Sequence, residues 1–544
     1  MRTPHTLGLR IRHPYRLRHA VALFSALAVV ATGAVACGTS SGTGADNVPS
    51  SSASLATGNT KKGGEVTMLV TGLNGRLDPV AANAFAFTTG GPMNAIYGNL
   101  TYLDSATNKI KMGFLQSLTP NGDYTVWTGK LTPGLKFSDD TPFDAEAVVF
   151  NLQRHADPTN GSLFLTNAKS LTPKAVDATT FTMTLQSPNV HFDAVFTEDF
   201  SYIGSPTAIR AAGSNFGTRP VGAGPFKVQN IDGANAVTLV PNPNYALFAK
   251  DEPRLDKLTF QAVADFPKES QALAANQAQI AAPYGGDAIK MFQTLPNTNV
   301  LINQTGAGSN VQMSHKRAPF NDPRAREAID LALDRTAVAN AFQPGTPPQT
   351  NLFAPNSPYY DTKYDYPKQN RERAQQLFDE LAAEGKPVVF EYLAADQTQI
   401  QICAQLIFSQ LKAYKNVTMT IKTVTTADYI KQQRAGNYQM VPNGLYLVNP
   451  IPELEDYYVT GGFLNSMGYS NPKVDAAFKD LHTQADAAKQ KEDYAIIQEE
   501  VNKDHVAYWA GQGLIGFVAN KDLVNITRVN YGNAPLWGPL GYKA

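Results

Sequence analysis

The sequence has few residues that could cross-link it or bind a polyanion. Its 544 residues include only two cysteines, Cys37 and Cys403, and its 46 lysines and arginines are balanced by 46 acidic residues. Two cysteines exclude a disulfide-rich scaffold, and a net charge of zero excludes a polybasic nucleic-acid binder. Because hydrophobic residues make up 43% of the chain, it is expected to fold, as three to four domains or one large multi-lobed body.

Recognisable catalytic motifs are also absent from the sequence. It has no Walker A sequence and no glycine-rich dinucleotide fingerprint. The segment Gly38–Gly42 matches G-x-S-x-G, but a nucleophile elbow needs a strand before it and a helix after it, and this stretch is polar and irregular. Five histidines beyond the N-terminal region are scattered, without a second ligand at zinc spacing. We therefore expect no catalytic residue, no metal and no cofactor.

Two acidic clusters could be mistaken for catalytic pairs. The first is interpreted as a turn and a helix start, because aspartate tolerates the left-handed conformation and acids favour helix N-termini. It contains Asp139, Asp140, Asp144 and Glu146. The second contains Glu453, Glu455 and Asp456 and is considered below with the ligand.

Residues 1–36 have the features of a secretory signal peptide. They contain five arginines and no acidic residue, followed by an uncharged, weakly apolar run from Ala20 to Ala36. Small residues end this run, which favours a cleaved signal over a membrane-spanning helix. The segment Ala34-Val35-Ala36-Cys37 resembles the lipobox of bacterial lipoproteins, with Ala34 in place of the usual leucine. The resemblance implies a lipid anchor on Cys37; the alternative is an ordinary signal peptide beside a chance cysteine.

Residues 37–62 are predicted to form the lipidated cysteine and a flexible tether. Residues 38–60 have almost no bulky apolar side chain, so they cannot bury enough surface to offset the entropy of ordering. Folded structure is expected to begin near Gly63. Without residues 1–36, 41 basic and 46 acidic residues remain, a net charge of −5 that offers nothing to duplex phosphates.

Strand and helix patterns are mixed after the tether. Apolar residues alternate over Val66–Val70 and Phe181–Leu185, which indicates half-buried strands. Helix starts are predicted at three capping sites, Asp144, Asp322-Pro323 and Asn471-Pro472.

One strand–helix–strand unit is predicted from PVVFEYLA, the helix that carries Cys403 and VTMTIKTV. Such a unit places its two strands parallel, which makes at least one lobe α/β. Cys403 lies on the apolar face of that helix, so it is interpreted as a buried structural thiol. If Cys37 is acylated, no intramolecular disulfide is available.

The ordered segments then resemble a known family. NAIYGNLTYLDSATNKIKMGFLQSL and YTVWTGKLTPGLKFSDDTPFDAEAVVFNLQRHADP resemble the signature region of the family 5 extracellular solute-binding proteins, the peptide-, nickel- and oligosaccharide-type receptors of bacterial ABC importers. Further matching fragments occur in family order, and together they extend from Gly63 to the end of the chain. They are Arg76-Leu77-Asp78-Pro79, Val221–Val228, Ala318–Arg335 and Met467–Phe478.

The resemblance implies an α/β periplasmic-binding-protein type II fold, with two lobes, an additional small domain and a discontinuous first domain. Domain I is expected at residues 63–102, 221–310 and 507–544, domain II at 103–220 and domain III at 311–506. A hinge would let the lobes close around a solute.

The resemblance also guides the prediction of the ligand site. Peptide-binding members use an aspartate in a Trp-x-x-Asp-Tyr-Pro type segment to neutralise the amino terminus of the ligand, whereas here Leu445 replaces the aromatic residue and Val448 the acid. Because a buried ammonium without a counter-charge costs several kcal/mol, either Glu453, Glu455 or Asp456 supplies the charge or the solute has no cationic end. The alternative is that Val448 packs in the core and the alignment is shifted.

Loops that face the gap between lobes are expected to bind the solute. Met313 and Ser314 stand where the family often has Phe-Asn at the domain crossover. The predicted ligand-binding residues are Leu73, Asn74, Met313, Ser314, Tyr446, Asn449 and Glu453.

The resemblance implies a substrate-binding lipoprotein that captures an oligopeptide or a related small polar solute and delivers it to an ABC permease and ATPase. It would be a monomer, lipid-anchored on the extracytoplasmic face of the cell membrane, with no catalytic activity and no nucleic-acid partner. Two alternatives stay open: a solute-sensing receptor lipoprotein without a role in import, and a tethered hydrolase.

Overall fold

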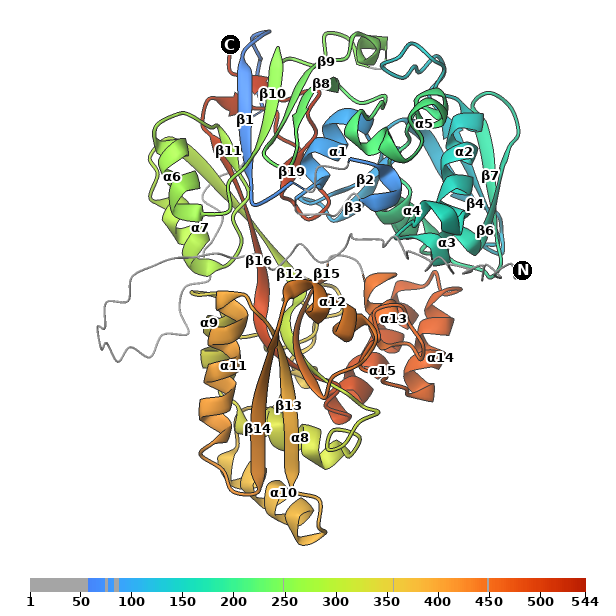
Figure 1. Ribbon diagram of the computed structural model, residues 1–544. Helices are drawn as coiled ribbons and strands as arrows, with labels where there is room; N and C mark the ends of the chain where they lie inside the picture. Colours follow the sequence, from blue (N-terminus) through green and yellow to red (C-terminus); the bar gives the residue numbers. More distant parts are fainter. Residues whose placement is uncertain (1–56, 74–76, 83–87, 248, 356, 448–449) are drawn as a thin grey trace, which may run out of the picture.

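The computed structural model describes residues 57–544 except for 74–76, 83–87, 248, 356 and 448–449. The predicted signal peptide, Cys37 and most of the tether lie outside the described residues. The described chain forms two lobes, and the long strands β12 (Thr298–Met313) and β16 (Ala507–Asn520) run from one lobe into the other (Figure 1). The mixed α/β class predicted from the sequence is confirmed.

A ten-stranded mixed sheet extends through both lobes in the order β14-β13-β15-β12-β16-β11-β1-β10-β9-β8. The first lobe supplies five of its strands, which pack against the helices α1 (Gly90–Tyr97), α6 (Phe266–Ala274) and α7 (Gly286–Gln293). These strands are β1 (Glu65–Val70), β8 (Phe226–Asp232), β9 (Ala236–Pro241), β10 (Lys257–Ala262) and β11 (Ile280–Ala281).

The first lobe also contains three smaller sheets. One of them, with the helices α2 (Ala145–Ala156), α3 (Leu165–Lys169), α4 (Phe192–Asp199) and α5 (Pro206–Ala212), forms what we call the small subdomain. Its strands are β4 (Leu115–Pro120), β5 (Val126–Leu131), β6 (Leu171–Ala175) and β7 (Thr180–Leu185). The others combine β2 (Thr101–Asp104), β3 (Lys109–Met112), β18 (Arg528–Val529) and β19 (Ala534–Pro535), and β17 (Leu523–Val524) with β20 (Gly541–Tyr542).

The second lobe contains the rest of the large sheet and its covering helices. Its strands are β13 (Val388–Ala395), β14 (Val417–Val424) and β15 (Met440–Leu447). Its helices are α8 (Pro323–Ala332), α9 (Arg335–Phe342), α10 (Arg371–Ala383), α11 (Thr398–Leu411), α12 (Thr426–Arg434), α13 (Glu453–Tyr458), α14 (Pro472–Leu481) and α15 (Ala487–Lys503).

Local sequence signals predict these elements well. The side chains of Asp144, Asp322 and Asn471 each accept a backbone hydrogen bond at the start of α2, α8 and α14, as the capping patterns predict. Asp140 has a φ of 66°, which confirms the turn interpretation of the first acidic cluster. Strands β13 and β14 are parallel on either side of α11, and the Cys403 side chain is completely buried, so both predictions for this unit are confirmed.

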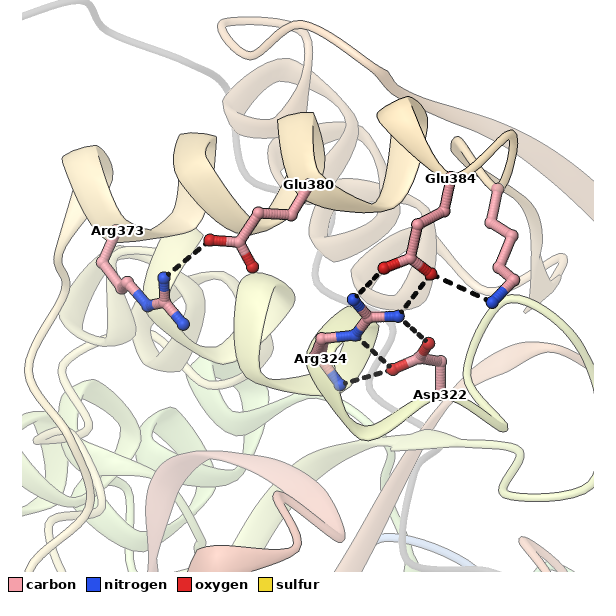
Figure 2. Close-up of polar contacts among 6 residues, drawn as sticks. Asp322, Arg324, Arg373, Glu380 and Glu384 are labelled. Carbon is pink, nitrogen blue, oxygen red and sulfur yellow. Dashed lines mark hydrogen bonds and ion pairs between the residues drawn. The ribbon is translucent and has the colours of Figure 1, made fainter.

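Charged side chains connect α8 to α10 on the surface of the second lobe (Figure 2). The Arg324 guanidinium lies between two carboxylates, 2.8 Å from Asp322 and 2.6 Å from Glu384. Hydrogen bonds from Arg324 and Lys386 lower the pKa of Glu384 to about 2. These pairs are solvent-exposed, so they contribute little free energy and mainly fix the approach of the two helices.

The C-terminal residues return to the first lobe and complete its core. The Trp537 ring packs edge-on against Phe260 with ring centroids 5.3 Å apart, and its Nε1 donates a 3.0 Å hydrogen bond to the Gly91 carbonyl oxygen. Thr60 and Lys543 form an antiparallel bridge at the two ends of the described chain. The first lobe is therefore discontinuous in sequence, as predicted from the family resemblance.

The strands β12 and β16 bend where they pass between the lobes. Their antiparallel register shifts between Thr305 and Gly308 and again between Ser309 and Asn310. Ala307 and Gly308 have φ values of 57° and 126°. A Cβ atom on Gly308 would lie 2.1 Å from the Gly511 carbonyl oxygen, so this crossing requires glycine.

We therefore expect Gly308→Ala to lower the free energy of unfolding by about 2–4 kcal/mol, because it adds both a steric clash and a strained φ. Urea denaturation of the full chain measures the change. Gly122→Ala is the matched control, since no heavy atom lies within 4 Å of the added methyl group. Equal stability of the two variants would contradict a close-packed crossing.

Glu269 is a buried carboxyl group on α6. Glu269 is 1% exposed, and neither of its carboxylate oxygens has a hydrogen-bond partner among the described residues. Burial raises the pKa of Glu269 to about 8, with a smaller contribution from the charge of Asp265. The folded state therefore retains a proton on this group that the unfolded chain has already lost at neutral pH.

Because a raised carboxyl pKa favours the folded state at low pH, stability should fall as the pH rises from about 5 to 8, by about 1.4 kcal/mol per pH unit for one proton. Glu269→Gln keeps the shape and removes the titration, so its unfolding free energy should depend less on pH over this interval. Chemical denaturation at several pH values measures both slopes. Identical slopes would show that Glu269 does not titrate in this range.

Candidate functional site

The two lobes meet at a surface that we call the interlobe seam. It consists of α4 and Tyr531 from the first lobe and α13 with His482 from the second. The Tyr531 hydroxyl donates a 2.9 Å hydrogen bond to Glu453 Oε1, and the Val190 backbone N–H donates a 2.7 Å hydrogen bond to the His482 carbonyl oxygen. Figure 1 shows α13 on the side of the second lobe that faces the first lobe.

Helix α13 is held against the strands that cross between the lobes. Leu454 and Tyr457 on its apolar side are buried. The Tyr457 hydroxyl donates a 2.9 Å hydrogen bond to Asn310 Oδ1 on β12, and Trp509 Nε1 on β16 donates a 3.1 Å bond to the Tyr458 hydroxyl. These bonds fix α13 to the crossing strands, so the position of its acidic first turn is set by β12 and β16.

Three carboxyl groups from both lobes gather at the seam. Burial raises the pKa of Glu453 to about 8; the hydrogen bond from Tyr531 opposes this rise, and the charges of Asp199 and Asp456 add to it. Burial likewise raises the pKa of Asp199 to about 7, opposed by a hydrogen bond from Asn167 and supported by the charge of Asp456. For Asp456, burial and then the charge of Glu455 raise the pKa to about 7.

A histidine and a glutamate lie beside these carboxyl groups. His482 Nε2 is 2.7 Å from Glu455 Oε1, and both side chains are partly exposed. Burial and the nearby His482 lower the pKa of His191 to about 4, so His191 is neutral at physiological pH. The seam thus presents mainly carboxyl groups, an environment suited to a cationic or hydrogen-bond-donating group.

The structure places the sequence-predicted residues in several environments. Glu453 lies in the seam, and Leu73 is buried in the core of the first lobe after β1. Met313 is completely buried in the core of the second lobe, and the buried Ser314 donates its N–H to the Gln439 carbonyl oxygen at 2.8 Å.

Tyr446 lies on β15, in register with Ala307 of β12 at the crossing. Asn74, Val448 and Asn449 lie outside the described residues. Of the predicted set, the described residues thus place Glu453 in the seam, Tyr446 beside the crossing, and Leu73, Met313 and Ser314 in the cores of separate lobes.

Sequence reasoning missed Asp199 and Tyr531. Asp199 ends α4 in the small subdomain, and Tyr531 lies near the C-terminus, so the two are far from Glu453 in sequence. Their proximity depends on the tertiary arrangement of both lobes, and neither carries a local motif that distinguishes it from a surface residue.

A surface pocket of about 330 Å³ lies between α2 and α5 of the small subdomain, away from the residues of the seam. Among the described residues no group of three or more histidine, cysteine, aspartate or glutamate side chains is arranged to hold a metal ion. Within the same part of the chain, no helix has the length and apolar character needed to cross a membrane.

Comparison with known proteins identifies relatives of this chain. Residues 109–460 match the model of the bacterial extracellular solute-binding proteins, family 5 middle region. The glutathione-binding proteins GsiB of Shigella flexneri and of Escherichia coli strain K12 are each 29% identical to it over 306 residues. These alignments cover 53% of this chain and 59% of each relative, so the chain spans less than two thirds of the curated relatives it matches.

Solved structures show the same fold over nearly the whole chain. AgaA from A. tumefacien R10, in complex with agropinic acid, is 22% identical with a TM-score of 0.76, over 88% of this chain and 99% of the other. The oligopeptide-binding protein AppA from Bacillus subtilis, in complex with a nonapeptide, is 17% identical with a TM-score of 0.74, over 89% and 100%. The predicted type II binding-protein fold is therefore confirmed.

Proposed function

Because the chain belongs to the family 5 extracellular solute-binding proteins of bacteria, we propose that it captures an oligopeptide or a related small polar solute between its lobes. The captured solute would pass chemically unchanged to an ABC permease and its ATPase. The arrangement that carries this proposal is the seam itself, where polar side chains from both lobes meet beside two bent crossing strands. A solute bound there would contact both lobes and favour their closed arrangement.

The location and assembly of the protein belong to the same proposal. The lipobox-like segment ending at Cys37 supports a lipid anchor on the extracytoplasmic face of the membrane, with the serine- and glycine-rich tether allowing the folded body to reach a permease. We propose a monomer without catalytic activity, in which Tyr446 and Asn449 line the solute site together with Asn74 and Glu453.

Val448 stands where peptide-binding members of the family have an aspartate, and this difference bears on the class of solute. A positively charged amino group at this site needs a counter-charge, which Glu453, Glu455 or Asp456 would supply, and Glu453 is the one of the three named among the ligand-binding residues. The names of the relatives support solutes that combine amino and carboxyl groups, since GsiB is named for glutathione and AppA was solved with a nonapeptide.

Solute capture should stabilise the protein. A specific solute at 100 times its dissociation constant should raise the free energy of unfolding by about 2.7 kcal/mol. Thermal-shift titration of the full chain against peptides, glutathione, opine-type acids, sugars and metal chelates tests this expectation, with calorimetry for any solute that produces a shift. Absence of a shift with every class would contradict solute capture.

For a solute that binds, Tyr446→Ala and Asn449→Ala should each weaken binding about tenfold or more while leaving the melting temperature of the solute-free protein nearly unchanged. The control is Val176→Ala, since Val176 is 59% exposed on the small subdomain. Unchanged affinity in both variants would remove these residues from the site.

Glu453→Gln should selectively weaken binding of solutes with a free amino group, because the amide cannot supply a negative charge. An N-acetylated form of the same solute should lose little or no further affinity in this variant. Calorimetry with the matched pair of solutes measures the difference. Equal losses for both forms would show that Glu453 does not pair with the amino group.

A further inference from the structure

Arg528 is a cation of the first lobe without an anionic partner. Its Nη1 is buried without a hydrogen-bond partner, and it forms no ion pair with a carboxylate in the described part of the chain. Burial lowers the pKa of Arg528 to about 10, and the charge of Asp104 opposes this effect, so the guanidinium stays protonated at physiological pH. A buried cationic N–H without an acceptor destabilises the fold, so this position needs another explanation than stability.

Asp104 is the acidic residue whose charge reaches Arg528, but its carboxylate serves a turn. Its Oδ1 accepts the backbone N–H groups of Ala106 at 2.9 Å and of Thr107 at 3.3 Å. These bonds hold the carboxylate in the turn between β2 and β3. Asp104 therefore stabilises the guanidinium only through space and does not occupy its hydrogen-bond donors.

The backbone of Arg528 is fixed on strand β18. Arg528 and Val529 pair with β19, and Val529 also lies opposite Asp104 of β2. The backbone N–H and the hydroxyl of Ser105 both donate to the Arg528 carbonyl oxygen, at 3.2 and 3.0 Å. The starting point of the side chain is thus set by two neighbouring strands.

The guanidinium lies against the turn that touches the second lobe. This turn follows β18 and carries Tyr531, whose hydroxyl donates to Glu453 at 2.9 Å. Asn303 Nδ2 on β12 donates a 2.8 Å bond to the Tyr531 carbonyl oxygen. A Cβ atom on Gly532 would lie 3.2 Å from Arg528 Nη1 and 3.3 Å from Asn303 Cβ. One short turn therefore connects the unpaired cation of the first lobe to the acidic helix of the second.

We propose that Arg528 binds a carboxylate, or another anionic group, of the captured solute at the first-lobe side of the seam. This inference rests on the proposed function and defines its substrate class more narrowly. The planar guanidinium can donate two parallel hydrogen bonds to a carboxylate, and Arg528 is only partly buried, so part of the residue is accessible to a solute.

An anion at this position gives the buried N–H an acceptor that the described residues do not provide. Binding then relieves a cost that the solute-free protein bears, which makes the contact favourable for solutes with a negative group. An acidic residue of α13 faces the same turn from the second lobe. The two sides of the seam together favour solutes that carry both an amino group and a carboxyl group.

A matched pair of solutes tests the assignment. Thermal-shift titration of the full chain first identifies an acid or a peptide that binds, and its primary amide then serves as the uncharged partner; for peptides the pair is trialanine and trialanine amide. In calorimetry the wild type should bind the free acid more tightly than the amide. Arg528→Gln should lose about tenfold or more in affinity for the free acid and little for the amide.

The solute-free melting temperature separates this role from a structural one. If the guanidinium only supported the turn after β18, Arg528→Gln would melt at a lower temperature and bind both members of the pair equally more weakly. As an anion site, its neutral replacement should melt at the same temperature or higher, because it removes an unpaired buried charge.

Two further variants complete the comparison. Arg528→Lys keeps the charge without the planar fork, so its affinity for the free acid should lie between those of wild type and Arg528→Gln; it also provides the test if Arg528→Gln does not fold. Arg371→Gln is the matched control, because it removes an exposed charge on α10, at the far end of the second lobe (Figure 1). It should leave both affinities unchanged.

Two results would overturn the anion site while solute capture stands. One is a captured solute for which the wild type does not distinguish the acid from its amide, or which has no anionic group. The other is an equal loss of affinity for acid and amide in folded Arg528→Gln. If no class of solute shifts the melting temperature of the wild type, capture itself is contradicted, and the anion site with it.

Discussion

The crossing of β12 and β16 constrains the rest of the molecule. Two strands must keep their backbone hydrogen bonds while passing from one lobe to the other, and a regular ladder over 14 to 16 residues would be stiff. Register shifts and the positive φ angles of Ala307 and Gly308 interrupt the regular ladder at the crossing. Bending is thereby confined to a short segment between two well-packed halves of one sheet.

The seam derives its geometry from that crossing. Tyr457 and Tyr458 connect α13 to the two strands, so the acidic turn of α13 is fixed to them by hydrogen bonds. Its opposite face is made by α4 and Tyr531, which belong to the first lobe. The hydrogen bond from Tyr531 to Glu453 therefore exists only when both lobes meet.

Local patterns in the sequence predict much of the fold, because they report interactions within a few residues. The caps at Asp144 and Asn471, the turn at Asp140 and the buried thiol of Cys403 all follow from spacing and side-chain type. The family resemblance predicts the two-lobed fold and the discontinuous first lobe. Glu453 was named with Glu455 and Asp456 as a possible counter-charge, but its hydrogen-bond partner Tyr531 was not identified, because Tyr531 reaches it only through long-range packing. The domain boundaries and the binding roles of Tyr446 and Asn449 stay predictions.

The return of the C-terminal segment to the first lobe has a consequence for biogenesis. Trp537 packs against Phe260 and bonds to Gly91, so the earliest-made lobe is missing a large part of its core until the last residues have been synthesised. Chains are made at about 5–20 residues per second, which leaves this lobe incomplete for many seconds. A polypeptide built in this way cannot complete its first lobe until translation of the C-terminal segment has ended.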